Sequence, residues 1–177
     1  IRDRIDKMLY RISNSIQYCS KCSITGLVLN NVKERLQMPY NYKKQNGELM
    51  SVMSQGEKFI HQSPVNDELS ALIKLLISKI NGCHYCVDIH KKELKELGVT
   101  QMKIDEVLSF RHLDLFTDQE KVTLEFAEML NSIKDFKKFE IIDRLKSFYD
   151  EEQIIDLVFV VNQINGWNRL NIISDKL

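Results

Sequence analysis

The chain has 177 residues, and 25 Lys and Arg residues balance 25 Asp and Glu residues, so its formal net charge at pH 7 is zero. This balance excludes the basic excess expected of a dedicated nucleic-acid or anionic-membrane binder. The hydrophobic share of 44% is typical of a folded protein, and 6 Gly and 2 Pro are few for this length. The composition therefore favours an all-α fold over a sandwich, a barrel or a Gly-rich nucleotide fold. No apolar run approaches the ~18 residues of a membrane span, and no secretory signal is visible, so a cytoplasmic location is expected.

Residues 1–38 are expected to form an additional helical pair that precedes the main domain, residues 39–177. Apolar residues recur at steps of three and four from Ile5 to Ile16 and again from Ile24 to Leu36. Pro39 ends the second of these helices, because the residue before a proline is disfavoured in the α region.

The next two helices are expected to differ in how deeply they are buried. A helix with weak periodicity is predicted between Leu49 and Ile60. Ser63 and Pro64 then predict the start of a second helix, with Ser as cap and Pro in the first turn. Apolar residues cover much of this helix up to the break at Asn81-Gly82, which predicts a central position.

Start and stop signals define the remaining helices. Gly98 is a good C-terminal residue for the helix that begins near Cys83, and Thr100 is expected to cap a short helix reaching Leu108 or Phe110. Thr117-Asp118-Gln119-Glu120 is a capping box, and Asp150 is expected to cap the last helix. The expected helices are residues 83–97, 100–110, 117–130, 139–148 and 151–173.

Three residues suited to redox chemistry follow the Asn81-Gly82 break at helical spacing. Cys83 and Cys86 are three residues apart and His90 comes four residues later, so one helix face carries all three. The free amides at the helix start stabilise a Cys83 thiolate, and His90 can exchange a proton with Cys86. In a chain without a secretory signal, this C-x-x-C spacing indicates redox or metal chemistry before a structural disulfide.

Two other interpretations of the cysteine and histidine motif remain open. The motif could bind zinc with a fourth ligand from elsewhere, although no matching Cys/His pair follows it, or it could be an inert buried cluster. His84 is expected at the surface or an interface, and Tyr85 is expected to pack against or line the pocket. The second C-x-x-C pair, Cys19 and Cys22, is either two ordinary thiols or a second dithiol that passes electrons to the first.

The stretch Ser78–His90, written S-x-x-N-G-C-x-Y-C-x-x-x-H, resembles the active-site helix of the carboxymuconolactone decarboxylase / alkylhydroperoxidase D family. The segment from Phe116 to Leu130 is similar to that family's F-T-x-x-E segment, and Asn165–Arg169 is similar to its terminal N-x-x-N-R helix. The three segments occur in the family's order, and the resemblance covers about residues 39–177.

This resemblance implies an all-α subunit that forms homo-oligomers, trimers or hexamers, without a metal or other cofactor. It implies an antioxidant thiol-dependent peroxidase or disulfide oxidoreductase, which reduces organic or hydrogen peroxides with electrons from a protein or small-molecule thiol. By the resemblance, Cys86 attacks the peroxide, Cys83 resolves the sulfenic acid to a disulfide, and His90 activates Cys86. The helix-dipole argument alone favours Cys83 as the more acidic thiol, so this order of attack rests on the resemblance.

One residue of the family's pattern is missing. The family carries a glutamate twelve residues before the first cysteine, where it starts the proton relay to the histidine, and here that residue is Ala71. Glu68 lies about one helical turn earlier and is a candidate catalytic substitute that acts through water. Alternatively, Glu68 stabilises the positive end of the helix dipole. General-base contributions are worth roughly 10²–10⁴-fold, so Ala71 predicts slow peroxide turnover.

Ala71 leaves a second function open, in which the dithiol of a redox-sensing or interaction subunit changes state without turnover. A third function is the lactone decarboxylation for which the family is also named. The true lactone decarboxylases do not depend on the C-x-x-C-x-x-x-H set, so the presence of Cys83, Cys86 and His90 argues against that branch.

Overall fold

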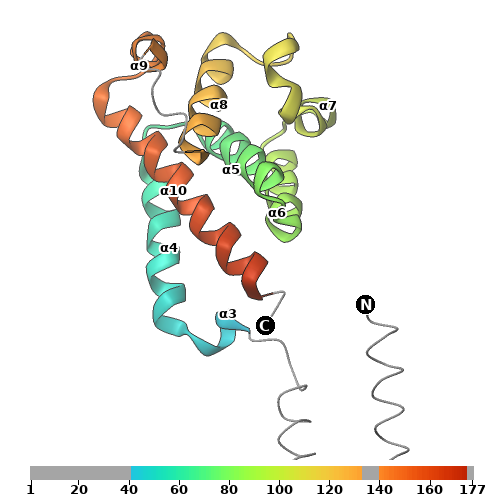
Figure 1. The fold of residues 1–177 in the computed structure, drawn as a ribbon, viewed down its shortest axis with the longest axis vertical. Helices are drawn as coiled ribbons and strands as arrows, with labels where there is room; N and C mark the ends of the chain where they lie inside the picture. The colour runs from blue at the N-terminus through green and yellow to red at the C-terminus, as the bar shows by residue number, and fades with distance from the viewer. Residues whose placement is uncertain (1–40, 133–139, 175–177) are drawn as a thin grey trace, which may run out of the picture. The chain divides into compact units, whose positions relative to one another are not determined.

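The computed structural model describes residues 41–132 and 140–174, all of which lie in the second of two units into which the chain divides, Tyr40–Leu177. Every regular element in these ranges is helical, which confirms the all-α prediction (Figure 1). The helices expected within residues 1–38, together with Cys19 and Cys22, lie outside the described residues. Within the described ranges, no helix is both long enough and apolar enough to span a membrane.

The described elements are seven main helices, one short helix at the beginning and one 3₁₀ segment. In chain order they are α3 (Tyr42–Gln45), α4 (Gly47–Gln62), α5 (Asp67–Asn81), α6 (His84–Glu96), α7 (Gln101–Asp105), η1 (Val107–His112), α8 (Asp118–Asn131), α9 (Glu140–Leu145) and α10 (Glu151–Ser174).

Helix α5 lies at the centre of the unit, as its apolar circumference predicts. It contacts α6, α8 and α10, and α10 also contacts α4 (Figure 1). Five of its Leu and Ile side chains are at most 1% exposed: Leu72, Ile73, Leu75, Leu76 and Ile77. Complete burial of such a side chain stabilises the fold by about 1.5–3 kcal/mol, so α5 is the main structural support of the residues that follow it.

The start of α5 differs from the prediction. Ser63 is the C-cap of α4, and its hydroxyl donates to Asp156 of α10. The N-cap of α5 is Asn66, whose side-chain oxygen accepts a hydrogen bond of 2.7 Å from the amide of Glu68. The prediction of a Ser63 cap is therefore wrong, because that hydroxyl is used in a tertiary contact and a better-placed Asn follows Pro64.

Other local signals are confirmed by the structure. Thr117 and Glu120 form the predicted capping box, and Asp150 accepts a hydrogen bond of 2.8 Å from the amide of Gln153 at the start of α10. Gly98 follows α6 with a φ of 84°. Thr100 caps α7, but this helix ends at Asp105 and the chain continues as the 3₁₀ segment η1.

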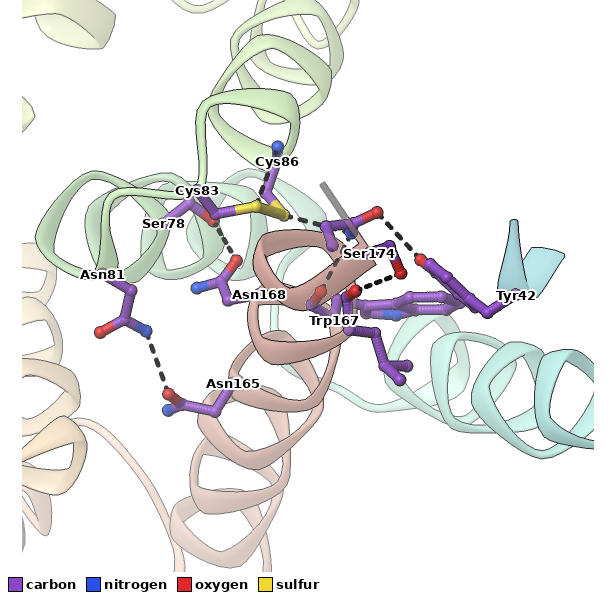
Figure 2. Close-up of a disulfide and its surroundings, with 11 residues drawn as sticks. Tyr42, Ser78, Asn81, Cys83, Cys86, Asn165, Trp167, Asn168 and Ser174 are labelled. Carbon is purple, nitrogen blue, oxygen red and sulfur yellow. Dashed lines mark hydrogen bonds between the residues drawn. A yellow bond between two sulfur atoms is a disulfide. The ribbon is translucent and has the colours of Figure 1, made fainter. Parts of the chain in front are cut away.

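Helix α10, with 24 residues, contacts α4, α5, α6 and α8. It packs against α5 and α4, and the rings of Phe59 and Phe159 meet edge to face with centroids 5.0 Å apart. Its last two turns lie beside the start of α6 (Figure 2). Residues far apart in the sequence, Cys86 of α6 and Asn171 of α10, are thereby in contact.

Candidate active site

The turn between α5 and α6 places Cys83 at the start of a helix. Gly82 adopts the left-handed conformation with a φ of 73°, and the amide of Cys83 donates to the carbonyl of Ser78 at 3.0 Å. This is the hydrogen-bond pattern with which helices often end, and glycine adopts the required φ without steric cost. As a result, Cys83 becomes the N-cap of α6.

Cys83 and Cys86 are joined by a disulfide, with their Cα atoms 5.3 Å apart. The sulfur of Cys83 accepts a hydrogen bond of 3.4 Å from the amide of Cys86, as expected for an N-cap side chain. Both residues are buried, at 2% and 3% exposure. The predicted pair therefore meets within one helical turn, and amide donation at the helix start favours a thiolate on Cys83 once the bond is reduced.

His90 lies one turn after Cys86 on α6 and is held by a carboxylate. Its Nδ1 lies 2.7 Å from Oε2 of Glu93. Burial raises the pKa of Glu93, but the hydrogen bond to His90 and the charges of Lys74, His90 and His61 outweigh it and hold that pKa below its ordinary value. Glu93 is thus an anion that fixes the orientation of the His90 ring.

A cavity of about 630 Å³ lies beside these residues, with walls from α3, α4, α5, α6 and α10. Cys86 and His90 line it, whereas Cys83 is not among its lining residues. Tyr85 and Trp167 supply aromatic surface, and the ammonium of Lys43 lies 3.8 Å from the centre of the Tyr85 ring. Of the two cysteines, Cys86 is therefore the one that borders space for a ligand.

An ion pair between a buried lysine and a half-buried glutamate forms another part of the cavity wall. Nζ of Lys74, which is 2% exposed, donates to Oε2 of Glu57 at 2.8 Å. The other oxygen of Glu57 accepts a hydrogen bond of 2.7 Å from the indole of Trp167. These bonds connect α4, α5 and α10 across the cavity wall, and they satisfy both charges of the pair.

Polar side chains also connect α5 to α10 beneath the disulfide (Figure 2). Ser78 donates to Asn168 at 3.1 Å, and Asn81 donates to Asn165 at 3.0 Å. Asn131 of α8 donates to Asn81 at 3.0 Å. These hydrogen bonds hold α5, α8 and α10 together next to the cysteines.

The structure brings together three of the four predicted site residues. Cys83, Cys86 and His90 lie along the first turns of α6, whereas Glu68 lies near the start of α5. The Glu68 carboxylate accepts a hydrogen bond of 3.0 Å from Lys103, which also bonds Glu120 at 2.6 Å. Glu68 lines a separate cavity of about 290 Å³, so the relay through Glu68 has no support in this geometry.

The two neighbouring aromatic residues lie as expected. His84 is exposed, and Tyr85 lines the cavity at 47% exposure. Ala71, in place of the family's glutamate, is completely buried. Within the described ranges, no cluster of three or more His, Cys, Asp or Glu residues has the arrangement of a metal site.

Sequence reasoning missed the carboxylates and amides that complete the site. Glu93 could have been found, because it follows His90 by three residues on the same helix. Lys74 also carries a signal, since it interrupts the apolar run Leu72–Ile77. Glu57, Asn171 and Tyr42 come from other helices, and no local pattern places them near Cys86.

Solved structures share this arrangement of helices. A protein of unknown function from Agrobacterium tumefaciens, described as a candidate antioxidant defence protein AhpD, has a TM-score of 0.74 at 26% identity, over 80% of this chain and 97% of that protein. The debrominase Bmp8 in complex with 2,3,4-tribromopyrrole has a TM-score of 0.68 at 22% identity, over 75% of this chain and 72% of the debrominase, and demonstrates a shared fold. The class is therefore that of AhpD-like helical proteins, which includes enzymes.

Sequence comparison gives the family. A family model described as the carboxymuconolactone decarboxylase family matches residues 48–129. The uncharacterized protein YdfG of Bacillus subtilis strain 168 is 36% identical over 124 residues, which are 70% of this chain and 84% of YdfG. The chain belongs to the carboxymuconolactone decarboxylase family, and the resemblance noted from the cysteine motif is confirmed.

Proposed function

We propose that this protein is a thiol-dependent peroxidase and disulfide oxidoreductase whose Cys83–Cys86 pair cycles between dithiol and disulfide. The observation that carries the proposal is the position of Cys86. Cys86 lines the 630 Å³ cavity together with His90, and Cys83 is bonded to it but is not among the lining residues. A peroxide in the cavity meets Cys86 first, so Cys86 is the attacking sulfur and Cys83 the resolving one.

The chemistry proceeds in three balanced steps. The Cys86 thiolate attacks one peroxide oxygen, the O–O bond breaks, and the alcohol leaves with a proton while Cys86 becomes a sulfenic acid. Cys83 then attacks the Cys86 sulfur, a water molecule leaves, and the disulfide forms. Two thiol groups of an electron donor reduce the disulfide by exchange and are themselves oxidised to a disulfide.

His90 and Glu93 supply the proton handling in this proposal. His90 takes the thiol proton of Cys86 and returns it to the leaving alkoxide. Glu93, 2.7 Å from Nδ1, holds the ring so that its other nitrogen is free to act. Glu93 therefore does part of the work for which the family uses the glutamate that is replaced by Ala71.

The proposal also includes a location in the reducing cytoplasm, an electron donor and self-assembly. The electron donor is a protein or small-molecule thiol, and the subunit assembles with copies of itself. Exposed apolar side chains on α4 and α10, among them Val52 and Ile155, are consistent with such an assembly. Light scattering at micromolar concentration should give a multiple of the subunit mass, and a monomeric mass would remove the oligomer from the proposal.

The proposed peroxidase step is tested on the reduced protein with one equivalent of cumene hydroperoxide. Intact-mass analysis should reveal the loss of two hydrogen atoms per chain within minutes, and peptide mapping should assign them to the Cys83–Cys86 bond. The Cys86→Ser variant should not react at this pair. The Cys83→Ser variant should accumulate a sulfenic acid on Cys86, trapped by dimedone.

Two results would contradict the proposal. A reduced protein that is unchanged after several minutes with the hydroperoxide would remove peroxidase chemistry. A sulfenic acid that forms on Cys83 in the Cys86→Ser variant as fast as the parent reacts would reverse the order of attack. The matched His84→Gln variant should react like the parent, because His84 is exposed on α6 and does not line the cavity.

Ala71 favours a second candidate function. Because this buried position has no carboxylate, the pair could act as a switch that records oxidation without turnover. The two functions differ in one measurement: consumption of hydroperoxide beyond one equivalent in the presence of a dithiol donor. Many equivalents consumed per chain identify an enzyme, and a single equivalent identifies a switch.

A further inference from the structure

The side chain of Asn171 contacts the Cys86 sulfur, and its orientation is fixed by its neighbours. Its Nδ2 donates to Sγ of Cys86 at 3.5 Å and to the carbonyl of Trp167 at 3.0 Å, and its Oδ1 accepts from the hydroxyl of Tyr42 at 2.9 Å. A backbone carbonyl can only accept a hydrogen bond, so the NH₂ group must face Trp167. One of its two hydrogens is used there, and the other is directed at sulfur.

The contact between Asn171 and the Cys86 sulfur is largely shielded from water. Asn171 is 9% exposed, Tyr42 4% and Cys86 3%, so water does not compete strongly for the sulfur. A thiolate is a stronger acceptor than a disulfide sulfur, and a hydrogen bond to an ionised group is roughly twice as strong as a neutral one. Reduction of the disulfide therefore strengthens the bond from Asn171.

We propose that Asn171 is the hydrogen-bond donor that stabilises negative charge on the Cys86 sulfur, and that Tyr42 positions the Asn171 amide for this task. Asn171 touches the reacting atom and is a catalytic residue in that sense, whereas Tyr42 acts through Asn171. The inference deepens the proposed function and rests on it, since Cys86 is taken as the attacking sulfur. It also gives Cys86 a donor to match the amide that serves Cys83.

Other charged groups act on the same sulfur and must stay constant in a test. From the elements packed around the cavity these are Lys43 of α3, Glu57 and His61 of α4, and Lys74 of α5. Helix α6 adds the titratable side chains Tyr85, His90, Lys92, Glu93 and Glu96. The cavity-lining residues of α10, Trp167 and Asn171, do not titrate, so a change at Asn171 alters the donor without removing a charge.

The experiment measures alkylation of Cys86 by iodoacetamide between pH 5 and 10 in the reduced Cys83→Ser protein. Mass spectrometry of the peptide that contains Cys86 separates this reaction from that of Cys19 and Cys22. Asn171→Leu should slow alkylation at pH 7 about tenfold and raise the midpoint pH by one unit, which is equivalent to about 1.4 kcal/mol. Tyr42→Phe should shift the profile in the same direction by about threefold, a smaller effect because the donor remains.

Asn162→Leu is the matched control, because Asn162 lies on the same helix and its side chain is exposed. Its alkylation profile should equal that of the parent. The proposal is overturned if Asn171→Leu and Tyr42→Phe, with parental circular dichroism, both leave the profile unchanged. If Asn171→Leu does not fold, Tyr42→Phe decides alone, since it removes a single hydroxyl. No peroxide is used, so a failure of the peroxidase proposal is detected separately.

Discussion

Lys74 is a charged residue in the centre of the unit, and its charge is stabilised by Glu57. The ammonium is 2% exposed and lies 2.8 Å from the carboxylate. Loss of one partner of a buried pair leaves a desolvated charge and typically costs 3–5 kcal/mol. We expect Glu57→Gln to lower the free energy of unfolding by about 3 kcal/mol, as measured by urea denaturation.

The double variant Glu57→Gln/Lys74→Met is the control for this prediction. It removes the charge that Glu57→Gln leaves without a counter-ion, so it should regain most of the lost stability. A double variant as unstable as Glu57→Gln would show that the cost comes from packing or from the bond to Trp167 instead of the charge.

Glu93 should influence reactivity through His90. Replacement by Gln removes the anion 2.7 Å from Nδ1 while keeping the shape of the side chain. We expect Glu93→Gln to slow oxidation of the reduced protein by cumene hydroperoxide about tenfold, the low end of the 10–100-fold that roughly a 1.4–2.7 kcal/mol loss would give. Stopped-flow measurement of thiol loss at pH 7 gives the rate.

Glu96→Gln is the comparison variant for Glu93. Glu96 lies on the same helix and lines the same cavity, but its carboxylate lies 3.7 Å from the ammonium of Lys92. It should react like the parent. Equal slowing in both variants would mean that the general negative charge of the cavity matters, and the specific bond to His90 does not.

Among individual residues, the sequence predicts those site residues that share one helix. Helical spacing alone groups Cys83, Cys86 and His90, because a helix fixes which residues share a face. The surroundings of Glu68 could not be predicted in this way. Its partner Lys103 is 35 residues away in the sequence, and no periodicity within α5 predicts the ion pair that occupies the carboxylate.

Among elements, the predictions were accurate wherever a start or stop signal uses only local groups. The capping box of α8 and the break at Gly82 involve residues within one turn of each other. The prediction of a Ser63 cap is wrong because the Ser63 hydroxyl donates a hydrogen bond to Asp156 of α10. This hydroxyl therefore does not cap α5. The local sequence therefore predicts a helix cap correctly only where the capping side chain makes no tertiary contact instead.

The left-handed turn at Gly82 can be tested directly. A Cβ at Gly82 would meet no atom within 4 Å, so the cost of Gly82→Ala comes from its φ of 73° alone. We expect a loss of about 1 kcal/mol in the free energy of unfolding. Because Gly82 directs the chain into Cys83, alkylation of Cys83 should also become slower.

Gly47→Ala is the matched control for the turn. A Cβ there also meets no atom within 4 Å, and its φ is not in the left-handed region. We expect no loss of stability, or a small gain from the better helix propensity of alanine. Equal losses in the two variants would contradict a role for the backbone conformation at Gly82.

For the molecule as a whole, the site depends on helices that meet only in the tertiary structure. Residues of α3, α4, α5, α6 and α10 line one cavity, so its ion pairs and hydrogen bonds report on the integrity of the entire unit. The fold class could be predicted from composition and the cysteine motif. The cavity could not, because its walls combine residues as distant in sequence as Tyr42 and Asn171.

The interactions of Glu93 with its neighbours in the cavity wall predict that the stability of the folded protein depends on pH. Burial raises the pKa of Glu93, but His90 and the charges of Lys74 and His61 hold it below the ordinary value of 4.5. The unfolded chain therefore takes up a proton at Glu93 first as the pH falls. The stability due to Glu93 is complete above about pH 4.5 and is lost as the pH falls through the lower pKa of the folded state.

Glu93→Gln removes this contribution and tests its sign. The melting temperature of the parent should exceed that of the variant at pH 7, and the difference should shrink between pH 5 and pH 3. Glu96→Gln, without a bond to His90, should keep a constant offset from the parent. A Glu93→Gln difference that stays constant, or grows, toward low pH would mean that Glu93 is not held as an anion in the folded protein. His90 would then lack the charged partner on which the proposed proton transfer from Cys86 depends.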